Sequence, residues 1–136
     1  MNYRITFPAD YKNIAPLRDL AFHCARLNGF EEQAAERLKA VVDELCNNAI
    51  EYGSQPTSQV ILSIQAEENK IKIICQDQGH GARKTAAELR ESMNEEVKST
   101  DMRGRGARII VKEFVDEFDI QDAKEGGIIV TAIINK

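Results

Sequence analysis

Polar and apolar residues alternate in three parts of the chain, and this period of two predicts β-strands. The first part lies near the N-terminus and ends at Pro8. The second and third parts, 60–66 and 71–75, are separated by polar residues 67–70, which predict a hairpin turn. The apolar positions of the three strands are Tyr3, Ile5, Phe7, Val60, Leu62, Ile64, Ala66, Ile71, Ile73 and Cys75.

A spacing of three to four residues between apolar positions predicts two long helices. The first begins near Asn13 and ends at Asn28-Gly29, and the second runs from about Glu31 to Glu51. Gly53 and Pro56 follow the second helix, as is common after a helix C-terminus. The apolar stripes are Ile14, Leu17, Leu20, Ala21, Cys24 and Leu27 in the first helix, and Ala34, Ala35, Leu38, Val41, Val42, Leu45 and Ala49 in the second.

The last third of the chain begins with a polar segment, 82–103, that has few large apolar residues. Long segments of this kind in compact domains are often lids, although a plain surface loop is the simpler interpretation. A third helix is expected to open at 104–106. A strand then begins at 118–120, and Gly126-Gly127 turns the chain into a final strand, 128–134, whose apolar residues on both faces indicate an interior position in the sheet.

The order of these elements predicts an α+β two-layer sandwich. We expect a mixed, mainly antiparallel sheet covered on one face by three helices. The 136 residues suit a single domain, 1–136, with the lid at about 82–103.

Charge and hydropathy exclude two classes of partner. Eighteen Lys and Arg residues against 22 Asp and Glu residues give a net charge of −4, so the overall charge attracts neither nucleic acid nor an anionic membrane. No apolar run approaches the roughly 20 residues of a membrane span. We therefore expect no direct nucleic-acid partner and no membrane association.

The cysteines and histidines do not suggest a metal site. Cys24, Cys46 and Cys75 are odd in number, widely spaced and set in apolar surroundings, which favours buried thiols in a reducing cytoplasm. His23 and His80 each lack a second ligand at metal spacing.

Three short motifs carry possible chemistry. Glu44 and Asn48 are four residues apart and share a helix face, where a carboxylate and a carboxamide can hold a hard cation and orient a hydroxyl. Residues 77–81, Asp-Gln-Gly-His-Gly, follow a strand, where an aspartate can accept a hydrogen bond from an exocyclic amine while glycines make room for a flat ring. Gly104-Arg105-Gly106 opens a helix, whose N-terminus attracts phosphate. Taken singly, each motif is better explained without a function: the first as an exposed pair on a helix, the second as a tight turn and the third as a flexible hinge before a helix.

The order of these motifs resembles a known family. Glu44 to Gly53 looks like the N-box, 77–81 like the G1 box, and 103–110 like the G2 box of the ATP-binding domain shared by gyrase, heat-shock chaperones, histidine kinases and mismatch-repair proteins, the Bergerat fold. Within that superfamily the chain is similar to the small bacterial anti-sigma factor serine kinases.

The resemblance implies a role for each site residue. Asn48 would coordinate Mg²⁺, and Glu44 would be the general base. Asp77 would accept a hydrogen bond from the adenine amino group of ATP. The glycines Gly79 and Gly81 would let adenine pack against the backbone, and the phosphates would be held by Gly104, Arg105 and Gly106.

Two positions depart from the family pattern. Ala107 replaces a larger aliphatic residue. Gly127 occupies the position where relatives usually carry a threonine, which helps to hold the water network between the aspartate and adenine. The second departure would lower the affinity for adenine.

Three alternative functions are compatible with these motifs. The first is a cytoplasmic ATP- and Mg²⁺-dependent serine protein kinase and anti-sigma factor that binds a sigma factor, phosphorylates an anti-anti-sigma antagonist on serine, and forms a homodimer through its first strand and helix. The second is a non-catalytic ATP-binding module that controls a different protein. The third, a detached histidine kinase domain, would need a phosphoacceptor, and His23 is the only helical candidate.

Overall fold

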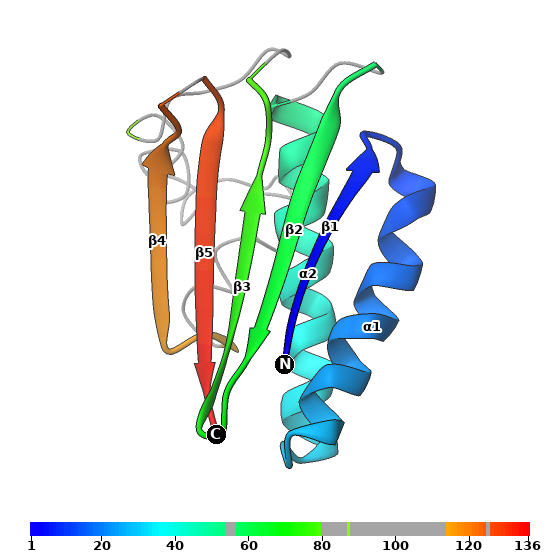
Figure 1. Cartoon of the computed structure of the whole chain (residues 1–136), viewed down its shortest axis with the longest axis vertical. Helices are drawn as coiled ribbons and strands as arrows, with labels where there is room; N and C mark the ends of the chain where they lie inside the picture. Colours follow the sequence, from blue (N-terminus) through cyan, green and yellow to red (C-terminus); the bar gives the residue numbers. More distant parts are fainter. Residues whose placement is uncertain (54–56, 80–86, 88–113, 125) are drawn as a thin grey trace, which may run out of the picture.

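The computed structural model describes residues 1–53, 57–79, 87, 114–124 and 126–136. Within these residues, two long helices lie side by side against one face of a five-stranded sheet (Figure 1). The elements in chain order are β1 (Asn2–Pro8), a 3-10 turn (Tyr11–Asn13), α1 (Ile14–Leu27), α2 (Glu32–Gly53), β2 (Gln59–Ala66), β3 (Lys70–Gln76), β4 (Glu117–Asp122) and β5 (Ile128–Asn135).

Every pairing in this sheet is antiparallel, and the strand order is β1-β2-β3-β5-β4. The prediction of a mixed sheet was therefore wrong for the described strands. Its mainly antiparallel character is confirmed. The pairs β2/β3 and β4/β5 are hairpins, and the pairs β1/β2 and β3/β5 are also antiparallel. The prediction that the last strand is interior is also confirmed, since β5 lies between β3 and β4.

Both long helices lie within two residues of their predicted bounds. The end of α1 has a local cause: the Asn28 side chain donates from Nδ2 to the carbonyl of Cys24 at 2.8 Å, and Gly29 follows with a φ of 83°. A left-handed backbone at this position is typical of a helix terminus. The predicted third helix, opening at 104–106, lies outside the described residues, so two rather than three helices are seen on the sheet.

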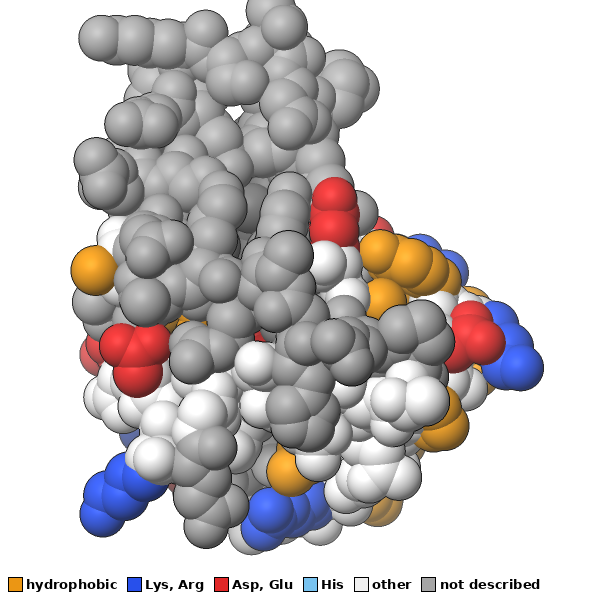
Figure 2. Space-filling view, turned by 90° about the horizontal axis from the view of Figure 1, so that it is seen from above, with side chains coloured by type: hydrophobic (Ala, Val, Ile, Leu, Met, Phe, Trp, Pro, Cys, Tyr) orange, Lys and Arg blue, Asp and Glu red, His pale blue; other side chains and the backbone are white. Residues whose placement is uncertain are grey.

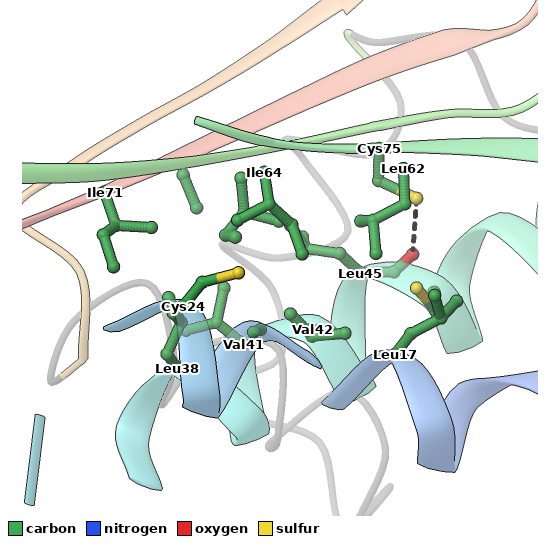
Figure 3. Packing of buried hydrophobic residues seen from close by; sticks show 14 of the residues in the cluster. Leu17, Cys24, Leu38, Val41, Val42, Leu45, Leu62, Ile64, Ile71 and Cys75 are labelled. Atoms are coloured by element: carbon green, nitrogen blue, oxygen red, sulfur yellow. Dashed lines mark hydrogen bonds between the residues drawn. The ribbon is translucent and has the colours of Figure 1, made fainter. Parts of the chain in front are cut away.

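The core fills the space between the helices and the inner face of the sheet (Figure 3). Leu38, Val41, Val42 and Leu45 of α2 are buried and point toward the sheet, where Leu62 pairs with Cys75 across β2 and β3. Burial of a large aliphatic side chain stabilises the fold by about 1.5–3 kcal/mol. The alternating pattern of the strands and the stripe of α2 thus meet in one apolar layer.

The expected burial of all three cysteines is confirmed: Cys24, Cys46 and Cys75 are free and buried. Phe114 and Val115, which precede β4, are half-buried and pack against the same core. In the part of the chain that is described, no helix is long and apolar enough to cross a membrane.

Candidate nucleotide site

The described candidate residues lie toward the C-terminal ends of helix α2 and strand β3. Glu44 and Asn48 lie in the C-terminal half of α2, Asp77 follows the last residue of β3, and Gly79 lies two residues further on. Both elements finish at the same end of the molecule (Figure 1). Seen from that end, the described surface carries both acidic and basic side chains (Figure 2).

A pair of buried cysteines connects the two elements. The Cys75 thiol donates to the backbone carbonyl of Leu45 at 3.6 Å, a contact drawn in Figure 3. A side-chain hydrogen bond with Cys46, followed by burial, raises the pKa of the Cys75 thiol well above its ordinary value of 9.0, and the nearby charge of Asp77 acts in the same direction. Since Leu45 and Cys46 lie between Glu44 and Asn48, this turn of α2 sits directly against the strand that ends at Asp77.

The two adjacent asparagines of α2 differ in environment. Asn47 donates from Nδ2 to the carbonyl of Asp43, one turn earlier in the helix, at 2.7 Å. Asp43 itself pairs with Arg18 of α1, with 3.1 Å between Nη1 and Oδ1. Asn47 therefore belongs to the flank of α2 that faces α1, whereas Asn48 lies on the same helix face as Glu44, whose Oε2 atom is buried.

Asp77 is one of the few buried polar residues among those described, with 6% of its surface exposed. Its Oδ1 atom accepts hydrogen bonds from the backbone amides of Gly79 at 2.9 Å and Ile128 at 3.2 Å. The backbone amide of Asp77 donates in turn to the carbonyl of Ile128 at 3.2 Å. Two amide donors on one oxygen fix the orientation of the carboxylate.

The chain after Asp77 needs glycine at one position. Gly79 has a φ of 72°, which residues with a side chain rarely adopt. Between these residues, Gln78 accepts a hydrogen bond from the backbone amide of Gln59 through Oε1 at 2.9 Å, which anchors the segment to β2. The backbone beside Asp77 is therefore held on both sides.

Sequence reasoning missed the partners of Asp77 on β5. The Gly126-Gly127 pair predicted a turn and the family pattern related position 127 to the aspartate, but neither predicted that Gly127 and Ile128 lie directly against Asp77, 51 residues away from Ile128 along the chain. Two successive glycines at a strand start were a signal that another backbone approaches closely.

Part of the predicted site lies outside the described residues. Gly81, the phosphate-binding candidates Gly104, Arg105 and Gly106, and the expected lid, apart from residue 87, are in this part.

A separate apolar pocket lies at the opposite end of β3, and its lining residues are Ala25, Phe30, Ala34, Leu38, Ile71 and Ile134. These residues offer no polar group, so the candidate chemistry stays at the Asp77 end.

A comparison with protein-family models shows the family to which the chain belongs. The model of the histidine kinase-like ATPase domain matches residues 7–134, nearly the whole chain. The chain belongs to this family. A search of curated proteins gave no match. The histidine kinase-like ATPase domain is an ATP-binding domain, and its five-stranded antiparallel sheet with two described helices is consistent with the Bergerat fold.

The described residues of this histidine kinase-like ATPase domain fit a nucleotide and a cation. The fixed, buried carboxylate of Asp77 lies beside Gly79, which has no side chain, and this arrangement suits an acceptor for the amino group of a flat base. Glu44 and Asn48 carry a carboxylate and a carboxamide on one helix face, and oxygen atoms of these types suit a magnesium ion.

Proposed function

We propose that the chain is an ATP- and Mg²⁺-dependent serine protein kinase that acts as an anti-sigma factor. In this proposal it binds a sigma factor and phosphorylates an anti-anti-sigma antagonist on serine. The observation that supports the ATP-dependent part is the contact of Cys75, two residues before Asp77, with Leu45, the residue after Glu44, in a chain of this ATPase family.

Each described residue has a defined task in this proposal. Asp77 accepts a hydrogen bond from the adenine amino group while its Oδ1 atom stays bound to the backbone. Asn48 coordinates Mg²⁺ through its carboxamide oxygen, and the ion neutralises charge on the phosphates. Glu44 accepts the proton of the attacking serine hydroxyl as the new bond between its oxygen and the γ-phosphorus forms, the bond from the γ-phosphorus to the bridging oxygen breaks, and ADP leaves.

The assignment to anti-sigma kinases rests on the sequence resemblance. The N-box, G1 and G2 motifs occur in the order that is typical of these kinases, and the resemblance spans essentially the whole chain. Phosphoserine adds close to two negative charges, which is sufficient to break the docking of an antagonist by repulsion. We propose a homodimer on the same basis, formed through β1 and α1.

The experiment that tests the kinase is phosphate transfer from radiolabelled ATP. The tagged chain and the small protein that co-purifies with it from the host are incubated with ATP and Mg²⁺, and phosphoserine is identified in the small protein. We expect transfer with the wild type, and a loss of about a hundredfold or more in Glu44→Gln, because the general base contributes on that order. Glu44→Gln should still bind ATP.

One observation favours a second candidate, a non-catalytic ATP-binding module that controls another protein. Gly127, where relatives usually have threonine, lies against Asp77, so the base-binding side of the site differs from the family pattern. ATP binding without phosphate transfer from the wild type would favour this module over the kinase.

A further inference from the structure

The ladder between β3 and β5 ends in an exchange between side chain and backbone. The last regular pair is Gln76 with Ile129. One step further, the amide of Asp77 donates to the carbonyl of Ile128, but the amide of Ile128 donates to the Asp77 carboxylate. The side chain of Asp77 thus takes the acceptor position that a backbone carbonyl has in a regular antiparallel pair.

The hydrogen bonds between Asp77 and Ile128 leave almost no space for a side chain at position 127. A Cβ atom at position 127 would lie 2.2 Å from the backbone oxygen of Asp77 and 2.9 Å from its Oδ1 atom. The turn is held in place by hydrogen bonds from Ala123 to the carbonyl of Gly127 at 2.9 Å and from Gly126 to the carbonyl of Ala123 at 3.2 Å. Any side chain at position 127 must therefore displace Asp77 or the turn.

Gly126 provides an internal comparison. Its φ of 98° is close to the 93° of Gly127, so a side chain strains the backbone similarly at either position. Among the residues that the structure describes, however, a Cβ atom at position 126 would meet only the backbone oxygen of Gln78, at an ordinary 3.8 Å. A side chain would therefore collide with Asp77 at position 127 but not at position 126, whereas φ is similar at the two positions.

We propose that Gly127 is a positioning residue for nucleotide binding, because the missing side chain determines where the Asp77 carboxylate lies. This inference rests on the proposed role of Asp77 as the acceptor for adenine. It also reverses the expectation drawn from the family pattern: in this chain, threonine at position 127 weakens adenine binding, because its Cβ atom would collide with Asp77.

The test is a set of ATP dissociation constants, measured calorimetrically with Mg²⁺ for the wild type, Gly127→Ala, Gly126→Ala, Asp77→Asn and the double variant Asp77→Asn/Gly127→Ala. We expect Gly127→Ala to weaken ATP binding by about tenfold or more, since small misplacements of a binding group have effects of this order or larger. Gly126→Ala should weaken it by less than about threefold. In the Asp77→Asn background, Gly127→Ala should have little further effect, because coupled residues are not additive.

Two outcomes overturn the inference: equal weakening by both alanine variants, or full additivity of Gly127→Ala with Asp77→Asn. A wild type that does not bind ATP contradicts the proposed function instead. Should Gly127→Ala not fold, hydrogen exchange of Asp77→Ala tests the same connection from the other side. The Ile128 amide should then exchange at least about tenfold faster than in the wild type, with the Gly126 amide unchanged. Unchanged exchange at Ile128 overturns the inference.

Discussion

The thiol of Cys75 on β3 donates a hydrogen bond to the backbone carbonyl of Leu45 on α2, with 3.6 Å between sulfur and oxygen. This contact joins two segments that are 30 residues apart in the chain. It places the helical turn from Glu44 to Asn48 beside the strand end at Asp77. The site proposed here therefore depends on a buried thiol pair that has no part in the chemistry itself.

The first prediction concerns alkaline stability. Because the pKa of Cys75 is raised in the folded protein, the folded state holds this proton at pH values where the unfolded chain has released it. The contribution of Cys75 to stability is therefore complete below pH 9.0 and is lost as the pH rises above that value, by up to about 1.4 kcal/mol per pH unit. Urea unfolding of wild type and Cys75→Ala at several pH values measures this difference.

Cys24→Ala serves as the control for this prediction. Burial also raises the pKa of Cys24, but to a smaller extent. Its removal should therefore reduce the alkaline loss of stability less than Cys75→Ala does. A free energy of unfolding that falls equally in wild type and Cys75→Ala would contradict the prediction.

The second prediction separates the two neighbouring asparagines. Asn48→Ala should abolish the dependence of ATP binding on Mg²⁺, because the carboxamide proposed to coordinate the ion is gone. Asn47→Ala should leave ATP binding unchanged, since the Asn47 side chain bonds to the carbonyl of Asp43 within its own helix. Titration of ATP with and without Mg²⁺ measures both effects, and equal losses in the two variants would exclude the assigned role of Asn48.

The third prediction concerns the two functions of Asp77. Asp77→Ala removes the acceptor for two backbone amides in a buried position, which should destabilise the fold by about 1–3 kcal/mol. Asp77→Asn keeps an oxygen acceptor and should destabilise it less. Thermal unfolding without nucleotide measures this difference.

ATP with Mg²⁺ should raise the melting temperature of the wild type, because a ligand that binds only the folded state stabilises it. The same shift should be lost in Asp77→Ala, which removes the proposed acceptor for adenine, and reduced in Asp77→Asn, which replaces the carboxylate by a carboxamide. A full ATP-dependent shift in Asp77→Asn would show that the carboxylate does not bind the base.

The fourth prediction tests the core at the end of β3 opposite to the candidate site. Leu38 is 2% exposed and Leu27 is 72% exposed, although both leucines belong to the predicted apolar stripes. Leu38→Ala should destabilise the protein by about 2–5 kcal/mol through the cavity it creates. Leu27→Ala should change the free energy of unfolding by no more than about 0.5 kcal/mol. Comparable losses in urea unfolding would place Leu27 in a buried contact.

The sequence predicted most local elements because each has its own period. The alternation of Val60, Leu62 and Ile64 indicated a strand with one buried face, and all three side chains are buried against the helices. It was less reliable about pairing: the expected mixed sheet is antiparallel among the described strands, since the direction of β1 beside β2 depends on contacts that no local period encodes.

Among the candidate residues, Glu44, Asn48 and Asp77 were visible in the sequence as polar side chains on one helix face or after a strand, and the family resemblance implied their roles. The family pattern also marked position 127, but the contacts of Gly127 and Ile128 with Asp77 were not visible. A glycine pair indicates a turn, but what the turn touches depends on the pairing of β3 with β5, which is formed by segments about 50 residues apart.

The amino-acid sequence by itself determined the positions of the described helices and strands, the membership in an ATP-binding family and the identity of the polar residues available for chemistry, because these follow from periodicity, motif order and side-chain type. Only the tertiary structure decided that the Asp77 carboxylate completes the ladder with Ile128, that Gly127 leaves it just enough space, and that Cys75 holds α2 beside it. Those relationships arise from close contacts between distant segments, and such contacts exist only once the chain is folded.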